Sequence, residues 1–348
     1  MAARVAGDPV LFAGTAGHVL DFDDTYLPGL AHLSAPVAPA ALVVGAERGA
    51  SAAEALTAFA AGFEAMGALA RASHPALYEG GWHPTAVCGG VGAAVAAATL
   101  LDAPREEAVA IALLRAGGLR AAFGSDGKAL QVGLASAAGV AAARLAAGGA
   151  RVPREEAARG FELATGGTYA EPGDAFGTSA IEQNWIKAWP CCLQTHGAIE
   201  AADRLGADAP DDLAVTVHPV SLLAAAQGPA PATGLQAKFS IPYLTAYTLL
   251  HGPPTVESFD SVDAAALERA RPIEVTSDPA LAESELVLHA GGTELARVEA
   301  ALGSPQRPLD AAALRAKVEG LAGPRLATVL DDTERPAREL LEVADLLL

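Results

Sequence analysis

Helical segments built from small residues dominate the first half of the chain. Ser51 and Glu54 stand three residues apart and form a capping box, which predicts a helix over 52–72. The apolar segment 85–101 contains three glycines, whose expected role is to let neighbouring helices approach closely. Further helices are predicted over 40–48, 105–117 and 135–147. The sequence therefore predicts a tightly packed helical body.

The hydrophobic period changes after about residue 205. Leu213, Val215 and Val217 alternate with other residue types, and this period of two predicts a strand. Two further segments, 284–289 and 293–298, flank an Ala-Gly-Gly sequence that predicts a hairpin. A smaller α+β unit is therefore expected in this part of the chain.

Helical sequence returns after Pro308, over 310–321 and 334–347. The fold is therefore predicted to be mainly α, with helical sequence at both ends of the chain and an α+β unit between them. The predicted domain boundaries are 1–205 for the first helical part, 206–305 for the α+β unit and 306–348 for the C-terminal return.

Composition and charge restrict the expected partners. The 348 residues are 51% hydrophobic but only 5% aromatic, and the formal net charge is −18. Such a negative field repels nucleic acid and anionic membranes, so neither is an expected partner. It also repels a polyanionic substrate unless Lys, Arg or His side chains lie nearby.

The cysteines and the apolar segments bear on the compartment. Three cysteines, two of them adjacent at 191 and 192, form no disulfide framework, which fits a reducing cytosol. Residues 1–20 lack the basic start and sustained apolar core of a signal peptide. The apolar run over 87–101 is too short to span a bilayer. The protein is therefore expected to be cytoplasmic.

The stretch Gly17–Ala41 concentrates polar groups within an otherwise apolar sequence. If residues 14–25 are helical, His18, Asp21 and Thr25 lie on one face, and His32 follows on a loop. Residues 21–24, with the sequence DFDD, contain three carboxylates, of which Asp21 is the first. An acid, a hydroxyl and an imidazole brought together predict an active-site wall. The alternative is a solvated carboxylate cluster or a helix cap.

Five motifs occur in order along most of the chain. They are GTAGHVLDFDDT (14–25), GGWHPT (80–85), GKALQVG (127–133), IKAWPCCLQTHGAI (186–199) and GLQAKFSIPY (234–243). In this order they resemble the MmgE/PrpD family, also called the 2-methylcitrate dehydratase family. Five ordered motifs are far more specific than any one of them.

The resemblance implies a fold and a class of reaction. The implied fold is an all-helical domain made from both chain ends, with the inserted α+β unit as a lid, in a homodimer. The implied reactions are dehydration, decarboxylation or epimerisation of a small polycarboxylate substrate, without cofactor or metal. They need a base such as histidine and cations that hold carboxylates. Relatives carry further helices before Gly14, so the chain is expected to be N-terminally shortened.

Carried over by position, the resemblance implies a set of site residues. His83 and His32 suit acid–base work by their chemistry, and Asp21 suits orienting an imidazole or a lysine. Lys128 and Lys187 suit binding the carboxylates. The remaining residues expected to bind substrate are Thr25, Tyr243, Cys192 and His196. The plainer alternatives are a structural histidine, surface lysines and a core tyrosine.

Departures from the family pattern bear on the reaction. Gln131 stands where relatives have histidine, and Leu134 stands where arginine is common. Cys192 replaces the histidine of the decarboxylating branch and matches many dehydratase- and epimerase-like relatives. We therefore expect a lyase that dehydrates a 2-methylcitrate-like hydroxy-polycarboxylate. The alternatives, in order, are an epimerase of an iminodisuccinate-like dicarboxylate, a decarboxylase of the cis-aconitate type and a catalytically inactive dimeric scaffold.

A metal site is a further alternative. The three aspartates together with His18 or His32 offer ligands for Mg²⁺ or Zn²⁺. No second metal-binding motif accompanies them in the sequence, so no metal is expected.

Overall fold

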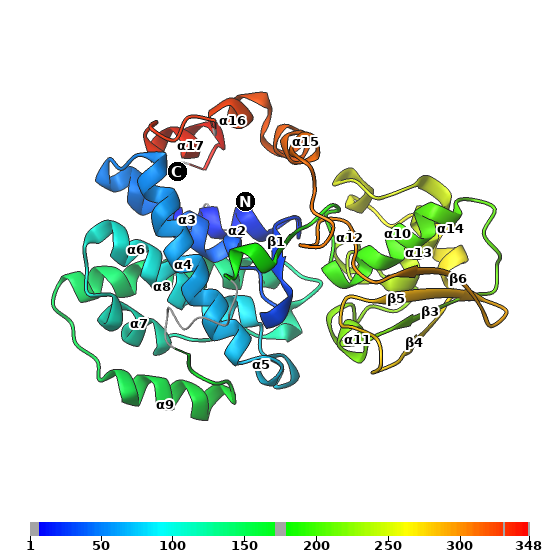
Figure 1. The fold of residues 1–348 in the computed structure, drawn as a ribbon, viewed down its shortest axis with the longest axis horizontal. Coiled ribbons are helices and arrows are strands. Elements are labelled where there is room, and N and C mark those ends of the chain that lie inside the picture. Colours follow the sequence, from blue (N-terminus) through cyan, green and yellow to red (C-terminus); the bar gives the residue numbers. More distant parts are fainter. Residues whose placement is uncertain (1–6, 171–178, 330, 347–348) are drawn as a thin grey trace.

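Helices form most of the chain, and the strands gather in two small sheets (Figure 1). The computed structural model describes residues 7–170, 179–329 and 331–346. The prediction of a mainly α protein is confirmed.

The helical body contains the longest helices of the described chain. Its elements are α2 (Pro9–His18), α3 (Ser34–Arg48), α4 (Ala52–Ala72), α5 (Ala76–Glu79), α6 (Pro84–Leu101), α7 (Arg105–Leu113), α8 (Gly127–Ala147) and α9 (Arg154–Thr165). The predicted capping box is present, since Ser51 and Glu54 bond reciprocally at the start of α4. Helix α8 begins eight residues before the predicted 135–147, which places Lys128 and Gln131 on its first turns.

Glycines bring α4, α6 and α8 into backbone contact. A Cβ atom added at Gly62 of α4 would lie 2.4 Å from the backbone oxygen of Gly92 in α6. A Cβ atom at Gly139 of α8 would lie 2.4 Å from the backbone oxygen of Gly90. Because side chains larger than hydrogen do not fit at these crossings, the predicted close packing of small-residue helices is confirmed.

Two helices of this body are long and apolar enough to cross a membrane. These helices are α6 and α8, and the criterion is length and composition alone. Helix α6 starts at Pro84, so its apolar window is longer than the predicted run over 87–101, and 83% of that window is buried inside the protein. Its apolar surface is therefore covered by the other helices of the body.

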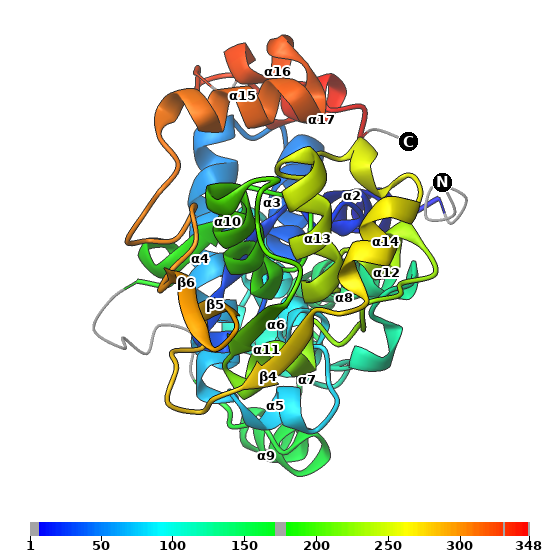
Figure 2. The ribbon, with the colours of Figure 1, turned by 90° about the vertical axis from the view of Figure 1, so that its right-hand side faces the viewer.

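A four-stranded sheet forms the centre of the α+β part, which faces the viewer in Figure 2. Its strands are β3 (Leu213–Val217), β4 (Glu274–Ser277), β5 (Leu286–Ala290) and β6 (Thr293–Val298), in the order β4-β3-β5-β6. Strand β3 pairs parallel with β4 and antiparallel with β5, and β5 pairs antiparallel with β6. The alternating residues Leu213, Val215 and Val217 are all buried, so the predicted strand and the predicted hairpin are confirmed.

Five of the described α-helices belong to the same part of the chain as this sheet. They are α10 (His196–Leu205), α11 (Pro219–Ala224), α12 (Gly234–Ala237), α13 (Ile241–His251) and α14 (Ala264–Ala270). Helices α10 and α13 pack against the strands of the sheet. Helix α10 packs against β5, β6 and α13, so this packed unit starts before residue 206. The division into domains at 205 and 305, and a lid role for the α+β part, stay predictions.

The C-terminal helices return to the helical body. They are α15 (Ala311–Ala322), α16 (Pro324–Val329) and α17 (Ala337–Val343), drawn at the top of Figure 1 with α17 nearest to α3. Helix α17 packs against α3 and α4, and the Ala337 amide donates to the Ala50 carbonyl. The predicted return of helical sequence after Pro308 is confirmed.

A two-stranded sheet joins the segment after α2 to the segment before α10. Strand β1 (Asp24–Tyr26) pairs antiparallel with β2 (Asn184–Ile186). The predicted helix over 14–25 is wrong in its second half, because α2 ends at His18. Asp21 has a φ of +53°, a left-handed conformation that a continuing α-helix does not allow. The reversal turns the DFDD segment into the protein interior.

Candidate active site

Asp21 joins two lysines that are distant in sequence. Its Oδ1 atom accepts hydrogen bonds from Lys128 Nζ at 2.7 Å and from Lys187 Nζ at 2.8 Å. Lys187 also donates to the backbone oxygen of Asp21 at 3.0 Å. Burial alone would raise the pKa of Asp21, but Lys128 and Lys187 hold it well below its usual range. Asp21 is therefore a carboxylate shared by two lysines.

Lys187 is fully buried behind Asp21. Its Nζ atom lies 3.8 Å from Asp23 Oδ1, and its backbone oxygen accepts a hydrogen bond from Lys317 Nζ of α15 at 2.8 Å. Burial opposes the charge on Lys187, but Asp21 and Asp23 raise its pKa above the usual value. The lysine is thus held as a cation by two carboxylates.

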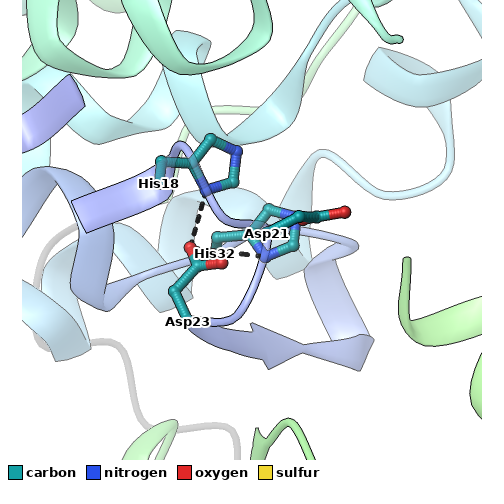
Figure 3. A group of neighbouring side chains, drawn as sticks. All are labelled: His18, Asp21, Asp23 and His32. Carbon is teal, nitrogen blue, oxygen red and sulfur yellow. Dashed lines mark hydrogen bonds and ion pairs between the residues drawn. The ribbon is translucent and has the colours of Figure 1, made fainter. Parts of the chain in front are cut away.

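Asp23 connects two imidazoles (Figure 3). His18 Nδ1 lies 2.7 Å from Asp23 Oδ2, and His32 Nδ1 lies 3.7 Å from the same oxygen. Burial would raise the pKa of Asp23, but His18 and His32 keep it well below its usual range. We call Asp21, Asp23, His18 and Lys187 the inner group, since their side chains are at most 5% exposed and pair with one another.

Asp24 has a structural role at the start of α3. Its carboxylate accepts hydrogen bonds from the backbone amides of Leu33 and Ser34, at 3.1 to 3.2 Å. Burial and then the neighbouring Asp23 raise the pKa of Asp24 to about 6. The third carboxylate of the DFDD segment therefore holds the loop that carries His32.

The metal alternative has a geometric basis but an unfavourable charge. One ligand atom from each of His18, Asp21, Asp23 and His32 lies within 4.8 Å of the others. Asp21 Oδ1, however, already accepts from two ammonium groups, and Lys187 also lies beside Asp23. These two positive charges would repel a divalent cation at this position. We therefore assign no metal to the inner group.

His83 is the residue that precedes α6, and it is almost completely buried. Its Nδ1 atom lies 2.6 Å from Gln131 Nε2 of α8. Its Nε2 atom has no hydrogen-bond partner among the described residues. Burial, followed by the nearby His18 and Lys128, lowers the pKa of His83 well below the usual value. The imidazole is therefore neutral at pH 7.

His32 is also held neutral. Its Nδ1 atom lies 2.6 Å from the backbone oxygen of Asp24 and 3.4 Å from Thr25 Oγ1. Burial lowers the pKa of His32 well below its usual value, although Asp23 acts in the opposite direction. A neutral imidazole carries one N–H donor and one lone pair, so both histidines can exchange protons or hydrogen bonds with a ligand.

A small cavity of about 40 Å³ lies between the helical body and the α+β part. Its lining, which we call the cavity wall, consists of Thr25, Leu30, His32, Tyr78, His83, Phe123, Lys128, Cys192, Leu193, Gln194, Ala224 and Phe239. Lys128 Nζ lies about 5 Å from the ring centres of Phe123 and Phe239, at 5.1 and 5.0 Å. The wall combines apolar surface with a few polar groups, the composition typical of ligand sites.

The structure divides the predicted site residues between these two places. His32, His83, Lys128, Thr25 and Cys192 belong to the cavity wall. Asp21 and Lys187 belong to the inner group directly behind Lys128. Burial raises the pKa of Cys192 to about 11, so this side chain is a neutral thiol.

Two predicted substrate-binding residues lie outside the cavity wall. The Tyr243 hydroxyl accepts a hydrogen bond from the Asp263 amide at 3.0 Å, because α13 directs this ring toward the start of α14. His196 is fully buried with its ring against Trp189, at a centroid distance of 5.1 Å. Burial lowers the pKa of His196 to about 3. Neither side chain is placed to touch a ligand in this conformation.

Gln194 belongs to the cavity wall and was not predicted from the sequence. Its Oε1 atom accepts a hydrogen bond from the Ser221 hydroxyl at 3.1 Å, and its Nε2 atom has no partner in the described part of the chain. Its position inside the motif around Cys192 was the available signal. Gln131 was recognised as a departure from the family pattern, but the pattern gave it no role.

Family models match nearly the whole chain. The MmgE/PrpD N-terminal domain matches residues 8–166, and the MmgE/PrpD C-terminal domain matches residues 189–342. The chain belongs to the MmgE/PrpD family. This family includes dehydratases and decarboxylases.

A curated relative is similar to part of the chain. Cis-aconitate decarboxylase of Homo sapiens is 29% identical over 270 residues, which are 71% of this chain and 56% of the relative. The chain thus spans little more than half the length of this relative.

Proposed function

We propose that the protein is a cofactor-independent lyase that dehydrates a small hydroxy-polycarboxylate of the 2-methylcitrate kind. The observation that carries this proposal is one cavity lined by two neutral imidazoles, His32 and His83, together with the ammonium group of Lys128. Removing a proton beside a carboxylate requires a neutral base and positive charge near the developing anion.

Lys128 is suited to bind a substrate carboxylate. An ammonium group has three N–H donors, and among the described residues one hydrogen bond of Lys128 Nζ goes to Asp21. The remaining donors are available to a ligand in the cavity. Gln194 adds an amide N–H₂ group without a partner in the described chain. These groups offset locally the repulsion that the net charge of −18 exerts on a polyanion.

Dehydration would break a C–H bond and a C–O bond on adjacent carbons. An imidazole of the cavity wall takes the proton beside the carboxylate, and the C–H electrons form the C=C bond. The hydroxyl group leaves with a proton and becomes water. The products are an unsaturated acid and water, so no oxidant or reductant is required.

Epimerisation of a related dicarboxylate is the second candidate. It is favoured by the presence of two imidazoles in the wall of one cavity, since one could remove a proton and the other could return it on the opposite face. Both reactions begin with the same proton removal. They differ in whether a hydroxyl group is expelled.

Incubation in D₂O with citrate, 2-methylcitrate and aspartate-derived diacids tests the proposal. Dehydration predicts an unsaturated product that absorbs near 240 nm and is visible by NMR. Deuterium incorporation or inversion without such a product would instead support epimerisation. If no acid of the panel is deuterated or converted, the enzymatic proposal fails.

We also propose that the protein is a cytoplasmic homodimer. Leu134 and Leu145 of α8 are 56% and 55% exposed, and their spacing of three helical turns places them on one face. A dimeric mass in light scattering at micromolar concentration would support this assembly. A monomeric mass would contradict it.

A further inference from the structure

The orientation of the Gln131 side-chain amide is fixed by the backbone of Leu119. Gln131 Oε1 accepts a hydrogen bond from the Leu119 amide at 2.8 Å, and Gln131 Nε2 donates to the Leu119 carbonyl at 3.2 Å. A backbone amide is only a donor and a carbonyl is only an acceptor. Rotating the Gln131 amide by 180° would oppose donor to donor and acceptor to acceptor, so only one orientation satisfies both groups.

This orientation determines the tautomer of His83. The second hydrogen on Gln131 Nε2 points to His83 Nδ1, and the two nitrogens are 2.6 Å apart. His83 Nδ1 must therefore be the acceptor, which leaves the imidazole proton on Nε2. A protonated His83 would place an N–H group against the Gln131 N–H₂ group. The contact thus keeps His83 neutral, in agreement with the lowered pKa that its burial produces.

His32 is held in the opposite tautomer. Its Nδ1 atom is 2.6 Å from the Asp24 backbone oxygen, which can only accept, so Nδ1 carries the proton. The lone pair of neutral His32 therefore lies on Nε2, which has no hydrogen bond to any described residue. Asp23 Oδ2, at 3.7 Å from His32 Nδ1, stabilises the imidazolium that forms when Nε2 takes a proton.

We propose that His32 is the only base among these two imidazoles, that His83 is a hydrogen-bond donor, and that Gln131 is the positioning residue that makes it one. This assignment of roles rests on the proposed function, whereas the tautomers follow from the contacts alone. It favours dehydration over two-base epimerisation, because His83 offers no lone pair in this tautomer.

The reaction then needs one base. His32 Nε2 takes the proton beside the substrate carboxylate, and His83 Nε2–H donates to the carboxylate oxygen on which charge develops. The C–H electrons form the C=C bond as the C–O bond breaks. His32 Nε2–H gives its proton to the departing hydroxyl, which leaves as water, and neutral His32 is restored.

Long-range ¹H–¹⁵N correlation NMR of the full chain labelled with ¹⁵N-histidine tests the tautomers without substrate. The variants His32→Gln and His83→Gln assign the two rings among the eight histidines. At pH 7 we expect a protonated Nε2 in His83 and a protonated Nδ1 in His32. A protonated Nδ1 in His83 would overturn the proposal whether or not the protein is an enzyme.

Gln131→Glu supplies a second test, with Gln131→Met as a control of similar size. A carboxylate at this position accepts but cannot donate, so we expect His83 to move its proton to Nδ1 or to become imidazolium. Methionine offers no strong donor, so the preference for Nε2 should weaken without reversing. If Gln131→Glu leaves the His83 tautomer unchanged, Gln131 does not set it.

The activity of Gln131→Glu with 2-methylcitrate provides the functional readout. Loss of one preorganised donor at a developing anion lowers kcat by about 10²–10³-fold. If His83 moves its proton to Nδ1, we expect a loss in this range, with a smaller change in KM. Unchanged kcat in a variant whose His83 tautomer has switched would refute the donor role while leaving the proposed reaction standing. Activity toward no acid at all in the wild-type protein would refute the proposed function instead.

Discussion

The inner group and the cavity wall use the same residue types for different purposes. In the inner group, Asp21, Asp23, His18 and Lys187 pair with one another at a depth where unpaired charge is costly. In the cavity wall, the imidazoles of His32 and His83 each use one nitrogen for a fixed partner and keep the other available. The difference shows that residue type alone does not identify the reactive groups. Atoms without a hydrogen-bond partner occur in the inner group as well, such as His18 Nε2, so it is the position on the cavity wall that makes such an atom available to a ligand.

Removing Asp21 should produce the largest effect on folding. Asp21→Ala leaves Lys128 and Lys187 without their shared carboxylate. Breaking a buried ion pair from one side costs about 3–5 kcal/mol. We expect a loss of this size in the free energy of unfolding measured with urea. Asp331→Ala is the matched control: it removes an exposed pair with Arg315 and should cost less than about 1 kcal/mol. Equal losses in the two variants would remove the distinction between the inner group and a surface pair.

Removing the His83 side chain should reduce activity with little effect on folding. His83→Ala deletes the donor that belongs to the cavity wall, and we expect kcat to fall by about 10²–10³-fold. Urea unfolding should report a much smaller change than for Asp21→Ala, because no buried charge loses its partner. Full activity in His83→Ala would exclude it from the chemistry. A collapse of stability would place His83 with the inner group.

The pH dependence of the free energy of unfolding tests the burial of His196 near the inner group. Unfolded His196 titrates near its ordinary value of about 6.5, whereas burial lowers its pKa to about 3 in the folded protein. Between these values the unfolded state binds one more proton, so stability falls as pH falls, by about 1.4 kcal/mol per pH unit. Urea titrations between pH 6 and pH 5 give the slope of the free energy of unfolding against pH. In His196→Leu this slope should be smaller by the contribution of one proton. An identical slope in both proteins would show that His196 titrates normally in the folded state.

The smallest effect is expected for Cys192→Ser. Burial keeps the Cys192 thiol neutral. On the cavity wall this side chain therefore contributes to the shape of the cavity and not to its charge. We expect kcat to change by less than about tenfold, which corresponds to about 1.4 kcal/mol in activation free energy. A loss as large as that of His83→Ala would mean that the sulfur takes part in the reaction.

Much of the fold follows from local sequence. The capping box at Ser51, the small-residue helices and the alternation around Val215 correctly predicted α4, the packed helical body and β3. The predicted helix over 14–25 fails because the left-handed Asp21 is stabilised by tertiary ion pairs. Local propensity contains no information about those contacts.

Several residues of the inner group and the cavity wall were named from the sequence, but their arrangement was not. Asp21 meets Lys128 and Lys187 across separations of 107 and 166 residues, which only the motif order linked. Tyr243 was expected at the substrate, yet the direction of α13 gives its hydroxyl to the Asp263 amide. The tautomer of His83 depends on where the Leu119 backbone meets Gln131. Three-dimensional packing, and not residue type, determines these partners and this tautomer.

Deuterium exchange at the substrate carbon tests the central claim, that proton transfer takes place at the cavity wall through His32. The wild-type protein and His32→Gln are incubated in D₂O with each acid of the panel, and exchange is followed by NMR. We predict that the wild-type protein exchanges or dehydrates at least one hydroxy-polycarboxylate. His32→Gln should slow this step by about 10²–10⁴-fold while unfolding at a similar urea concentration. Exchange by His32→Gln at the wild-type rate would contradict the account.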